Sequence, residues 1–350
     1  MKTYRVKKLI FLLMVTVLLS GCGLFSGSGK EDIDPPQKVT YDDEKNVTGE
    51  DEKKGTNVTG ENTVLTQLYL IDKNGYVVPR TFALPYTESV AKQALEYLVK
   101  GGPIDNMLPD DFRAVLPEGT EVSVDIQDGV ATVDFSNEFQ EYAPEDEVRI
   151  LESIVWTLTQ FDSVKSVKLK MNGYPLTEMP VNKTPINGDL TKKVGINIDL
   201  NGVVDITNTR PVTVYYIVQN DKEIYYVPVT KRVSIKEGDL VKAVVKELVN
   251  GPDVSTPLFT ALMYDVELLD DPKIQNGVAT LNFNENIFSS YDKKVISDQV
   301  LNSLVLSLTE LDGIEAISIQ VRGEKNIVNQ EGVKLADSVS RPKEVNTGSY

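Results

Sequence analysis

Hydrophobic and polar residues alternate through a short stretch that occurs twice in the chain. Residues 128–135 read Asp-Gly-Val-Ala-Thr-Val-Asp-Phe, and residues 276–283 read Asn-Gly-Val-Ala-Thr-Leu-Asn-Phe. Asp-Gly and Asn-Gly pairs favour the positive φ angles of a two-residue hairpin loop. The alternation that follows is typical of a strand with one buried face. Such a close copy, 148 residues further along the chain, predicts a duplicated domain.

The residues before this stretch repeat as well, as a hairpin followed by a helix. Residues 65–72 alternate up to the turn signal Asn74-Gly75 and continue at 76–84, and the second copy has 212–219, a polar turn and 223–230. A helix follows in each copy, because apolar residues three or four positions apart share one face. They are Val90, Ala91, Ala94, Leu95 and Leu98, and in the second copy Val241, Val244, Val245 and Leu248. Asp239 is the expected N-cap of the second of these helices, and Gly101 and Gly251 are expected to end them.

A further helix and a last strand complete each copy. The helix positions that share one apolar face are Val148, Leu151, Val155 and Leu158, and in the second copy Leu301, Leu304, Val305 and Leu308. Trp156 lies amid the first of these faces and is expected in the core. The strands that follow cover 164–171 and 314–321. Each copy is therefore predicted to be an α+β domain with the order β-β-α-β-β-α-β, at residues 63–185 and 211–325.

Two other segments lie between and after the copies. Residues 186–210 contain one alternating run at 196–200, a turn at Asn201-Gly202 and a second run at 203–206. This pattern predicts an interdomain hairpin and a rigid connection. Residues 326–350 are polar and are expected to form a frayed tail.

The N-terminus has the pattern of an export signal. Lys2, Arg5, Lys7 and Lys8 precede an apolar run of eleven residues, 9–19. As a helix this run spans about 16 Å, which is too short to cross a bilayer, so residues 1–21 are predicted to be a signal peptide. Residues 19–22, Leu-Ser-Gly-Cys, resemble the lipobox of bacterial lipoproteins, and the resemblance implies lipidation of Cys22. The alternative is a secreted protein with a chance cysteine. Residues 22–62 carry few apolar side chains and are predicted to be a disordered acidic linker.

Charge and missing residue types exclude several classes of function. The net charge is −16, and removal of the four basic residues of the signal peptide leaves about −20. Such an acidic chain is not expected to bind nucleic acid, because phosphate binding requires a basic surface. The sequence has no histidine, and Cys22 is its only cysteine. Histidine-based catalytic triads, zinc sites built on His or Cys, and disulfides within the chain are therefore excluded.

Acidic clusters are the remaining candidates for chemistry. Asp110-Asp111, Glu145-Asp146-Glu147 and Asp270-Asp271 could supply a glycosidase-like carboxylate pair, but they occupy loops or helix starts, where acids are solvated or favoured by the helix dipole. Asp199, Asn201 and Asp205 suggest a calcium loop, but their spacing fails the EF-hand pattern and favours turn residues. We therefore predict no catalytic residue, no cofactor and no metal site.

Four tyrosines are the candidates for an interaction surface. Tyr215, Tyr216, Tyr225 and Tyr226 lie on the first hairpin of the second copy, where they could form an aromatic docking surface or a sugar-binding platform. Because alternate residues of a strand face opposite sides, half of them are expected in the core.

Taken together, these signatures resemble the GerMN domain family. The residues that carry the resemblance are 98–103, 116–120 and 128–135 in the first copy, and 248–252 and 276–283 in the second. The second copy departs at residues 263–266, where the Pro-Glu-Gly turn of residues 117–119 is missing. The resemblance implies ring-building-motif-like α-β-β-α-β cores, similar to domains that pack side by side in sporulation-specific envelope complexes.

The function implied by this resemblance is assembly rather than catalysis. We expect a non-enzymatic scaffolding protein, needed for sporulation and spore germination, that is held through the lipid on Cys22 at the extracytoplasmic face of the cell membrane. Its expected partners are envelope proteins of a complex between mother cell and forespore, with peptidoglycan as a further candidate. The alternative is a lipoprotein that binds cell-wall glycan or muropeptide. Hydrolysis of the cell wall by carboxylates is a third and weaker hypothesis.

Overall fold

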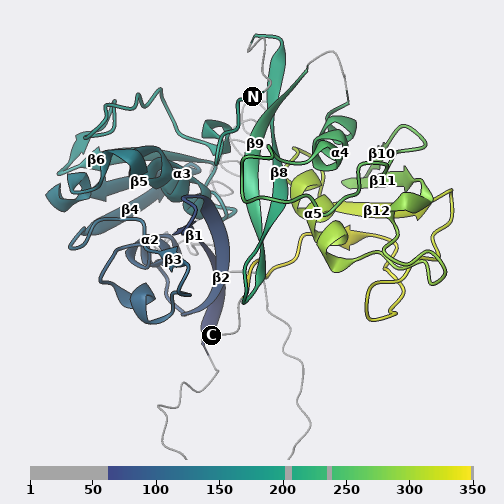
Figure 1. Cartoon of the computed structure of the whole chain (residues 1–350). Helices are drawn as coiled ribbons and strands as arrows, with labels where there is room; N and C mark the ends of the chain where they lie inside the picture. Colours follow the sequence, from purple (N-terminus) through teal and green to yellow (C-terminus); the bar gives the residue numbers. More distant parts are fainter. Residues whose placement is uncertain (1–61, 202–206, 235–238, 348–350) are drawn as a thin grey trace, which may run out of the picture. The chain divides into compact units, whose positions relative to one another are not determined.

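The structure is a computed structural model, and it describes residues 62–201, 207–234 and 239–347 (Figure 1). The predicted signal peptide, Cys22 and nearly all of the acidic linker lie outside the described residues. Among the residues that are described, no helix is both long and apolar enough to span a bilayer.

The first repeat consists of a long hairpin, two helices and a four-stranded sheet. β1 (Thr63–Asp72) and β2 (Val77–Pro85) form the antiparallel hairpin, which leads to α2 (Val90–Glu96). The short strand β3 (Phe112–Arg113) pairs with the end of β1. The sheet has the order β4-β5-β6-β7, and β5 and β6 are parallel because α3 connects them. Its elements are β4 (Val122–Gln127), β5 (Val130–Phe135), α3 (Glu147–Leu158), β6 (Ser166–Met171) and β7 (Tyr174–Pro175).

The second repeat follows the same order. Its hairpin consists of β8 (Thr209–Gln219) and β9 (Ile224–Ser234), and α4 (Leu240–Asn250) follows. The sheet has the order β10-β11-β12-β13, again with a parallel central pair joined by a helix. Its elements are β10 (Lys273–Gln275), β11 (Val278–Phe283), α5 (Asp298–Leu308), β12 (Ala316–Val321) and β13 (Val339–Ser340). The predicted α+β class and the element order of both copies are confirmed.

Short 3-10 turns lie between these elements. They are η1 (Pro103–Asn106), η2 (Asn137–Gln140), η3 (Pro144–Asp146), η4 (Lys192–Val194) and η6 (Glu285–Ile287).

The duplicated stretch forms the same tight hairpin in both repeats. Asp128 and Gly129 have φ angles of 51° and 81°, and Asn276 and Gly277 have 50° and 75°. Such positive values suit glycine and are tolerated by Asp and Asn. Every second residue of β5 and of β11 is buried, as the alternation predicts.

The helices confirm the predicted cores and correct two details. Trp156 is buried as predicted. Val148 is 47% exposed, because the unbroken run of buried residues in α3 extends only from Ile150 to Leu158. Asp239 caps α4 by accepting from the N–H groups of Val241 and Lys242, and α4 ends at Gly251 as predicted. The helix α2 ends at Glu96 rather than at Gly101, because Val99 pairs with Leu116 as an isolated β-bridge.

The predicted interdomain hairpin is wrong in its first arm. Residues 196–200 contain no strand; instead they run beside β9, where the Thr230 N–H donates to the Ile196 carbonyl and the Asp199 N–H donates to the Thr230 carbonyl. Asp199 forms a parallel bridge with Lys231. The second arm, 203–206, lies outside the described residues. The described part of this segment therefore extends the edge of β9.

The expected frayed tail is also wrong for residues 326–347. Val339 and Ser340 form β13 and pair with β12, and the Val345 side chain is only 2% exposed. We call residues 339–346 the C-terminal strap. Their polar side chains, which suggested a tail, have specific partners that are described below.

Candidate functional site at the junction of the two repeats

The tyrosine hairpin lies inside the molecule rather than on its surface. Tyr215, Tyr216 and Tyr225 are 0% exposed, and Tyr226 is partly buried. Both faces of the hairpin are covered, because β8 packs against α4 and α5 while β9 packs against β2 of the first repeat (Figure 1). The predicted aromatic docking surface or sugar platform is therefore wrong. Alternation alone could not show this, because it describes a strand with one open face.

Each tyrosine hydroxyl group has a buried or partly buried partner. The Tyr215 hydroxyl donates to Glu310 Oε1 at 2.9 Å, that of Tyr216 to the Glu247 carbonyl at 2.9 Å and that of Tyr225 to Asp72 Oδ2 at 2.8 Å. Asn302 Nδ2 donates to the Tyr226 hydroxyl at 3.1 Å. Burial raises the pKa of Tyr225, and the negative charge of Asp72 raises it further. In these contacts Tyr215, Tyr216 and Tyr225 are structural donors, and Tyr226 is an acceptor.

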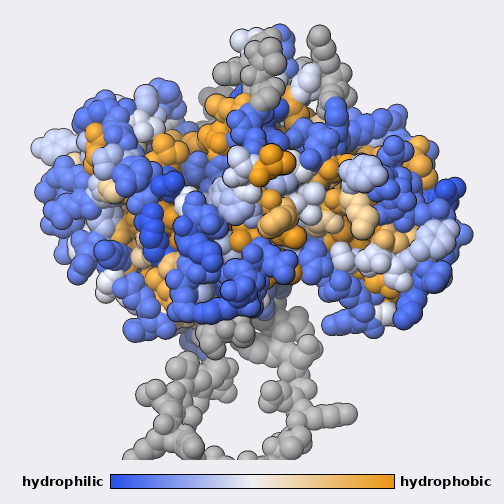
Figure 2. Space-filling view, viewed as in Figure 1, coloured by the Kyte–Doolittle hydropathy of each residue, from blue (hydrophilic) through white to orange (hydrophobic). Residues whose placement is uncertain are grey.

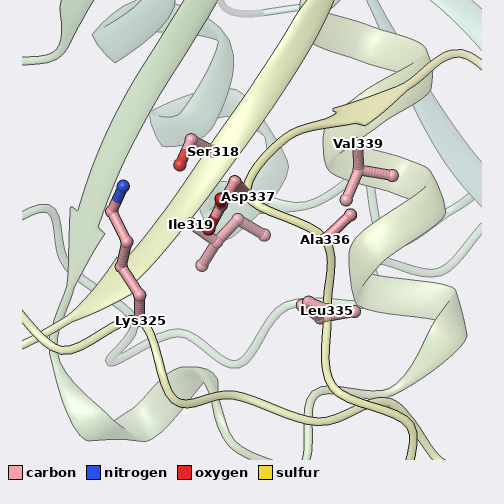
Figure 3. Close-up of a pocket in the computed structure, with 7 residues that line it drawn as sticks. All are labelled: Ser318, Ile319, Lys325, Leu335, Ala336, Asp337 and Val339. Atoms are coloured by element: carbon pink, nitrogen blue, oxygen red, sulfur yellow. The ribbon is translucent and has the colours of Figure 1, made fainter.

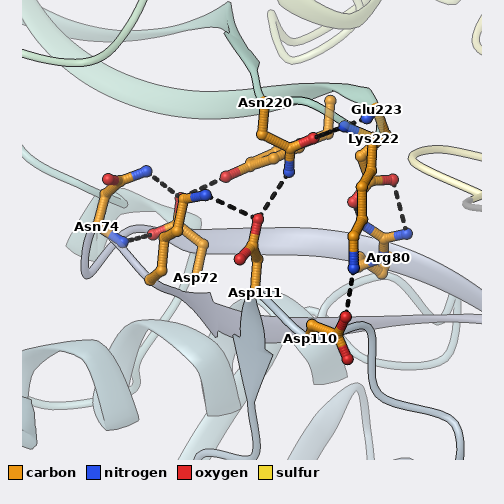
Figure 4. Close-up of polar contacts among 10 residues, drawn as sticks. Asp72, Asn74, Arg80, Asp110, Asp111, Asn220, Lys222 and Glu223 are labelled. Atoms are coloured by element: carbon orange, nitrogen blue, oxygen red, sulfur yellow. Dashed lines mark hydrogen bonds and ion pairs between the residues drawn. The ribbon is translucent and has the colours of Figure 1, made fainter.

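The turn between β8 and β9 is bound to the first repeat by charged and polar contacts (Figure 4). Asn220 Nδ2 donates to Asp111 Oδ2 at 2.8 Å, and Lys222 pairs with Asp110. Lys73 also pairs with Asp111, and this hydrogen bond is the main cause of the lowered pKa of the Asp111 carboxyl group. The acidic pair Asp110-Asp111 thus connects the repeats and is not free for catalysis.

A buried arginine forms a bidentate ionic contact at this junction. Arg80 is 0% exposed, and its two terminal nitrogens donate to Glu223 at 2.7 and 3.1 Å. The guanidinium group also lies 4.5 Å from the centre of the Phe112 ring. A bidentate pair of this kind has a fixed geometry and so sets the register between the two hairpins.

Two asparagines connect the facing edges of β2 and β9, and we call them the asparagine bridges. Asn197 accepts from the Val77 N–H at 2.8 Å and donates to the carbonyls of Val77 and Pro228 at 2.8 and 2.7 Å. Asn346 accepts from the Tyr226 N–H at 2.7 Å and donates to the carbonyls of Pro79 and Tyr226, each at 2.8 Å. Both asparagines have positive φ angles, 47° and 56°. Their amide groups thus replace direct strand pairing between the repeats.

The C-terminal strap is held by a buried charge. Arg341 Nη2 lies 2.9 Å from Glu310 Oε1, and Lys192 Nζ lies 2.9 Å from Glu310 Oε2. Burial opposes ionisation of Glu310, but Arg341 and Lys192 outweigh it and lower the pKa of the carboxyl group. Further along, Val345 exchanges hydrogen bonds with Thr81 of β2. The strap therefore runs from the sheet of the second repeat to the hairpin of the first.

The acidic cluster at the start of α3 is also structural. Glu147 is 0% exposed and accepts from the Tyr142 hydroxyl, from the Thr184 hydroxyl and from three backbone N–H groups, those of Val181, Asn182 and Thr184. Burial raises its pKa, but these hydrogen bonds prevail and lower it to about 2. Asp146 pairs with Arg113 and Arg149.

The other candidates for chemistry are occupied as well. Asp270 accepts from Asn282, and Asp271 pairs with Lys242. Asp199 pairs with Lys231, whereas Asp205 lies outside the described residues. Over residues 62–201, 207–234 and 239–347 no three His, Cys, Asp or Glu side chains are grouped to hold a metal ion.

A depression between β12 and residues 335–339, in the described part of the chain, has room for only about one water molecule (Figure 3). On the face seen in Figure 2, apolar side chains lie in small groups among hydrophilic ones. In the described part of the chain, functional contacts are therefore to be sought on strand edges and helix faces.

Comparison with known proteins supplies the family. The family model Germane, described as sporulation and spore germination, matches residues 67–177 and 213–327. The chain belongs to this family. It is 51% identical over 349 residues to the spore germination protein GerM of Bacillus subtilis, with 95% of each chain covered.

The solved structure of a pair of tandem GerMN domains agrees with this assignment to the family. The tandem GerMN domains of the sporulation protein GerM from Bacillus subtilis cover 81% of this chain and all of that chain, with 53% identity and a TM-score of 0.78. The first GerMN domain of the same protein is 61% identical and covers 37% of this chain and 99% of that chain, with a TM-score of 0.37. The resemblance to GerMN domains inferred from the sequence is confirmed.

Proposed function

We propose that this protein is a lipid-anchored, non-enzymatic assembly protein of a sporulation-specific envelope complex between mother cell and forespore. A diacylated Cys22 would hold it at the extracytoplasmic face of the membrane, and envelope proteins of the complex would be its partners. Spores formed without it would be few and would germinate poorly.

The observation that carries this proposal is the similarity to GerM along 95% of both chains, together with the description of the family as sporulation and spore germination. The junction supports a scaffolding role. The buried Arg80–Glu223 pair, the asparagine bridges and the strap hold two repeats in one compact unit. Two domains in a fixed arrangement can present several partners with fixed binding surfaces.

The residues on which the competing functions depended are mostly buried or paired in the structure. The glycan-binding alternative depended on aromatic and acidic surface residues, and three of the four candidate tyrosines are fully buried. Hydrolysis depended on free carboxylates, and the acidic clusters are engaged with Lys73, Lys222, Arg113, Arg149 and Lys242. Binding to peptidoglycan is therefore measured in the test as an outcome that would contradict the proposal.

The test compares the intact chain with an anchor variant in sporulating cells of its native host. Proteins that co-purify with the tagged chain after mild cross-linking are identified, and the purified chain is sedimented with isolated peptidoglycan. We expect recovery of envelope proteins made during sporulation and no sedimentation. Retention on peptidoglycan with no envelope protein recovered would overturn the proposal, as would normal sporulation of cells that lack the gene.

The anchor is tested by Cys22→Ala. Without the thiol no thioether to lipid can form, so the protein should accumulate as an unprocessed precursor or appear in the medium. Unchanged processing and membrane retention of Cys22→Ala would show that lipidation does not hold the protein.

A further inference from the structure

The strand β4 forms an open edge of the first repeat's sheet. It is six residues long and pairs only with β5, so alternate residues direct their N–H and C=O groups away from the sheet. Over the described residues, no hydrogen bond reaches residues 123–127 from outside the sheet. Ile126, near the end of this edge, is 38% exposed.

The other long strands at sheet edges are covered. On β1, Gln160 bonds both backbone groups of Gln67, and Thr157 and Ser153 bond those of Tyr69. On β8, the Ser307 hydroxyl accepts from the Tyr215 N–H, and Phe259 pairs with Ile217. The asparagine bridges cover β2 and β9, as described above. An uncovered strand of six residues is therefore an exception in this fold.

The second repeat has a shorter strand at the same edge. Its equivalent strand, β10, has only three residues and follows Asp270-Asp271-Pro272. Short length, charge and proline, which lacks a donor, are the means by which proteins protect an edge from pairing. The two copies of the hairpin are otherwise matched, and Ile274, 54% exposed, stands where Ile126 stands in the first repeat.

The negative charge around β4 indicates which kind of segment can bind at this edge. Between Arg113 and Arg149 the chain has ten acidic residues and no lysine or arginine. Four of the ten, Glu118, Glu121, Asp125 and Asp128, lie on or beside β4. The nearest lysine before β4 is Lys100 and the nearest after it is Lys165, which packs against the hairpin tip; Lys168 and Lys170 lie on β6, beyond β5. A second copy paired at this edge would place like charges on neighbouring strands, which is destabilising.

We propose that β4 binds an extended segment of a different protein, which adds as an outer strand and carries lysine or arginine between aliphatic residues. The backbone of the segment completes the hydrogen bonds of the edge, an aliphatic residue packs beside Ile126, and the basic residues meet Asp125 and its acidic neighbours. This inference rests on the proposed assembly function and names the surface and the partner chemistry that it uses.

The test places a photoreactive benzoylphenylalanine at Ile126, or at Ile274 as the matched control, in the full chain in sporulating cells. We expect a cross-link to another protein from position 126, with a yield at least about tenfold above that from position 274. The attached peptide should map to a segment that alternates aliphatic and basic residues. A cross-link to a second copy of this chain, an acidic or helical attachment site, equal yields at both positions, or no adduct would each overturn the proposal.

A second measurement separates this inference from the proposed function. Ile126→Lys leaves the fold intact, because the side chain is partly exposed, but adds a charge that disfavours strand addition. Cells with Ile126→Lys should form at least about tenfold fewer spores than cells with Ile274→Lys. Equal spore counts, in a host where deletion of the gene abolishes sporulation, would overturn the β4 proposal and leave the assembly function intact.

Discussion

The helices α3 and α5 occupy the same place in the two repeats but carry their buried charge at opposite ends. α3 begins with the fully buried Glu147, whereas α5 begins after Ser297, whose side chain accepts from the Val300 N–H. Past the other end, the first repeat has the neutral Gln160, which bonds the edge of β1, and the second has the buried Glu310.

Each buried carboxylate holds the segment that is particular to its own repeat. Glu147 binds residues 181–184, which follow β7, and Glu310 binds the strap through Arg341. The apolar positions between these ends are shared by both helices and are buried in both, except that Leu301 of α5 is only partly buried. The duplicated core therefore defines the common fold, and the ionic contacts at its ends define what each copy attaches to it.

Among changes that test this difference between the two helices, replacement of Glu147 is expected to have the largest effect on stability. Glu147→Ala leaves two partly buried hydroxyl groups and three backbone donors without this acceptor, which should lower the free energy of unfolding by about 4 kcal/mol. Ser297→Ala removes one cap and should cost about 1 kcal/mol. Urea unfolding of both variants measures the difference, and equal losses would mean that the two helix starts are energetically alike.

The opposite end should show the reverse order. Arg341→Ala leaves Glu310 buried with only Lys192 as its cationic partner and should cost about 3 kcal/mol. Gln160→Ala, at the first-repeat position equivalent to Glu310, removes neutral hydrogen bonds and should cost about 1.5 kcal/mol. If Gln160→Ala proved the more damaging in the same unfolding assay, the strap would not be held mainly by charge.

A third pair differs in its response to pH. Burial raises the pKa of Glu152 to about 7, against the opposing effects of the Asn197 N–H and Arg149, whereas the equivalent residue of α5 is the uncharged Asn302. The folded state therefore binds this proton more tightly than the unfolded state. Its stabilising effect is fully present below pH 4.5 and is lost as the pH rises to about 7.

Replacement of the carboxyl group should remove this dependence. At about 1.4 kcal/mol per pKa unit, Glu152→Gln should raise the free energy of unfolding at pH 8 by up to about 3 kcal/mol and flatten its decline between pH 4.5 and 7. Asn302→Asp provides the control, because it places a carboxyl group at the matching site. An unchanged pH profile of Glu152→Gln would show that this carboxyl group titrates normally in the folded protein.

The smallest expected difference between the two repeats is at the hairpin turns. Gly129 and Gly277 have φ angles of 81° and 75°, and a Cβ atom at either would lie 3.2 to 3.3 Å from a flexible side chain, that of Lys165 or of Glu315. Gly129→Ala and Gly277→Ala should each cost about 1.5 kcal/mol, measured by thermal unfolding. A clear difference between them would contradict the equivalence of the two hairpins.

The parts of the fold that were predictable from the sequence are those whose geometry is determined by a few neighbouring residues. Asp-Gly and Asn-Gly set both hairpin turns, Asp239 and Gly251 bound α4, and the period of apolar residues identifies the helices. These are local effects, and the duplication repeats the hairpin turns and the helix periodicity, whereas the cap and the glycine stop of α4 have no counterpart at α2.

What the sequence could not show depends on contacts between distant segments. Tyr225 is buried because β9 meets the first repeat, and Val345 is buried because the strap reaches Thr81, 264 residues away. Polar residues such as Asn346 and Arg341 look like those of a frayed tail until their partners are known. The open edge of β4 can likewise be recognised only once the partners of the other long edge strands are known.

Because of the strap, the described chain ends close to where it begins. β1 starts at Thr63, opposite Pro85 of β2, and the strap finishes on the same strand, at Thr81 and Pro79. Both ends of the folded part thus lie on one hairpin, four to six residues apart along β2. The fold has no obligatory first element: a short peptide joining these ends, with new termini opened at an exposed turn, would preserve every pairing between the two repeats.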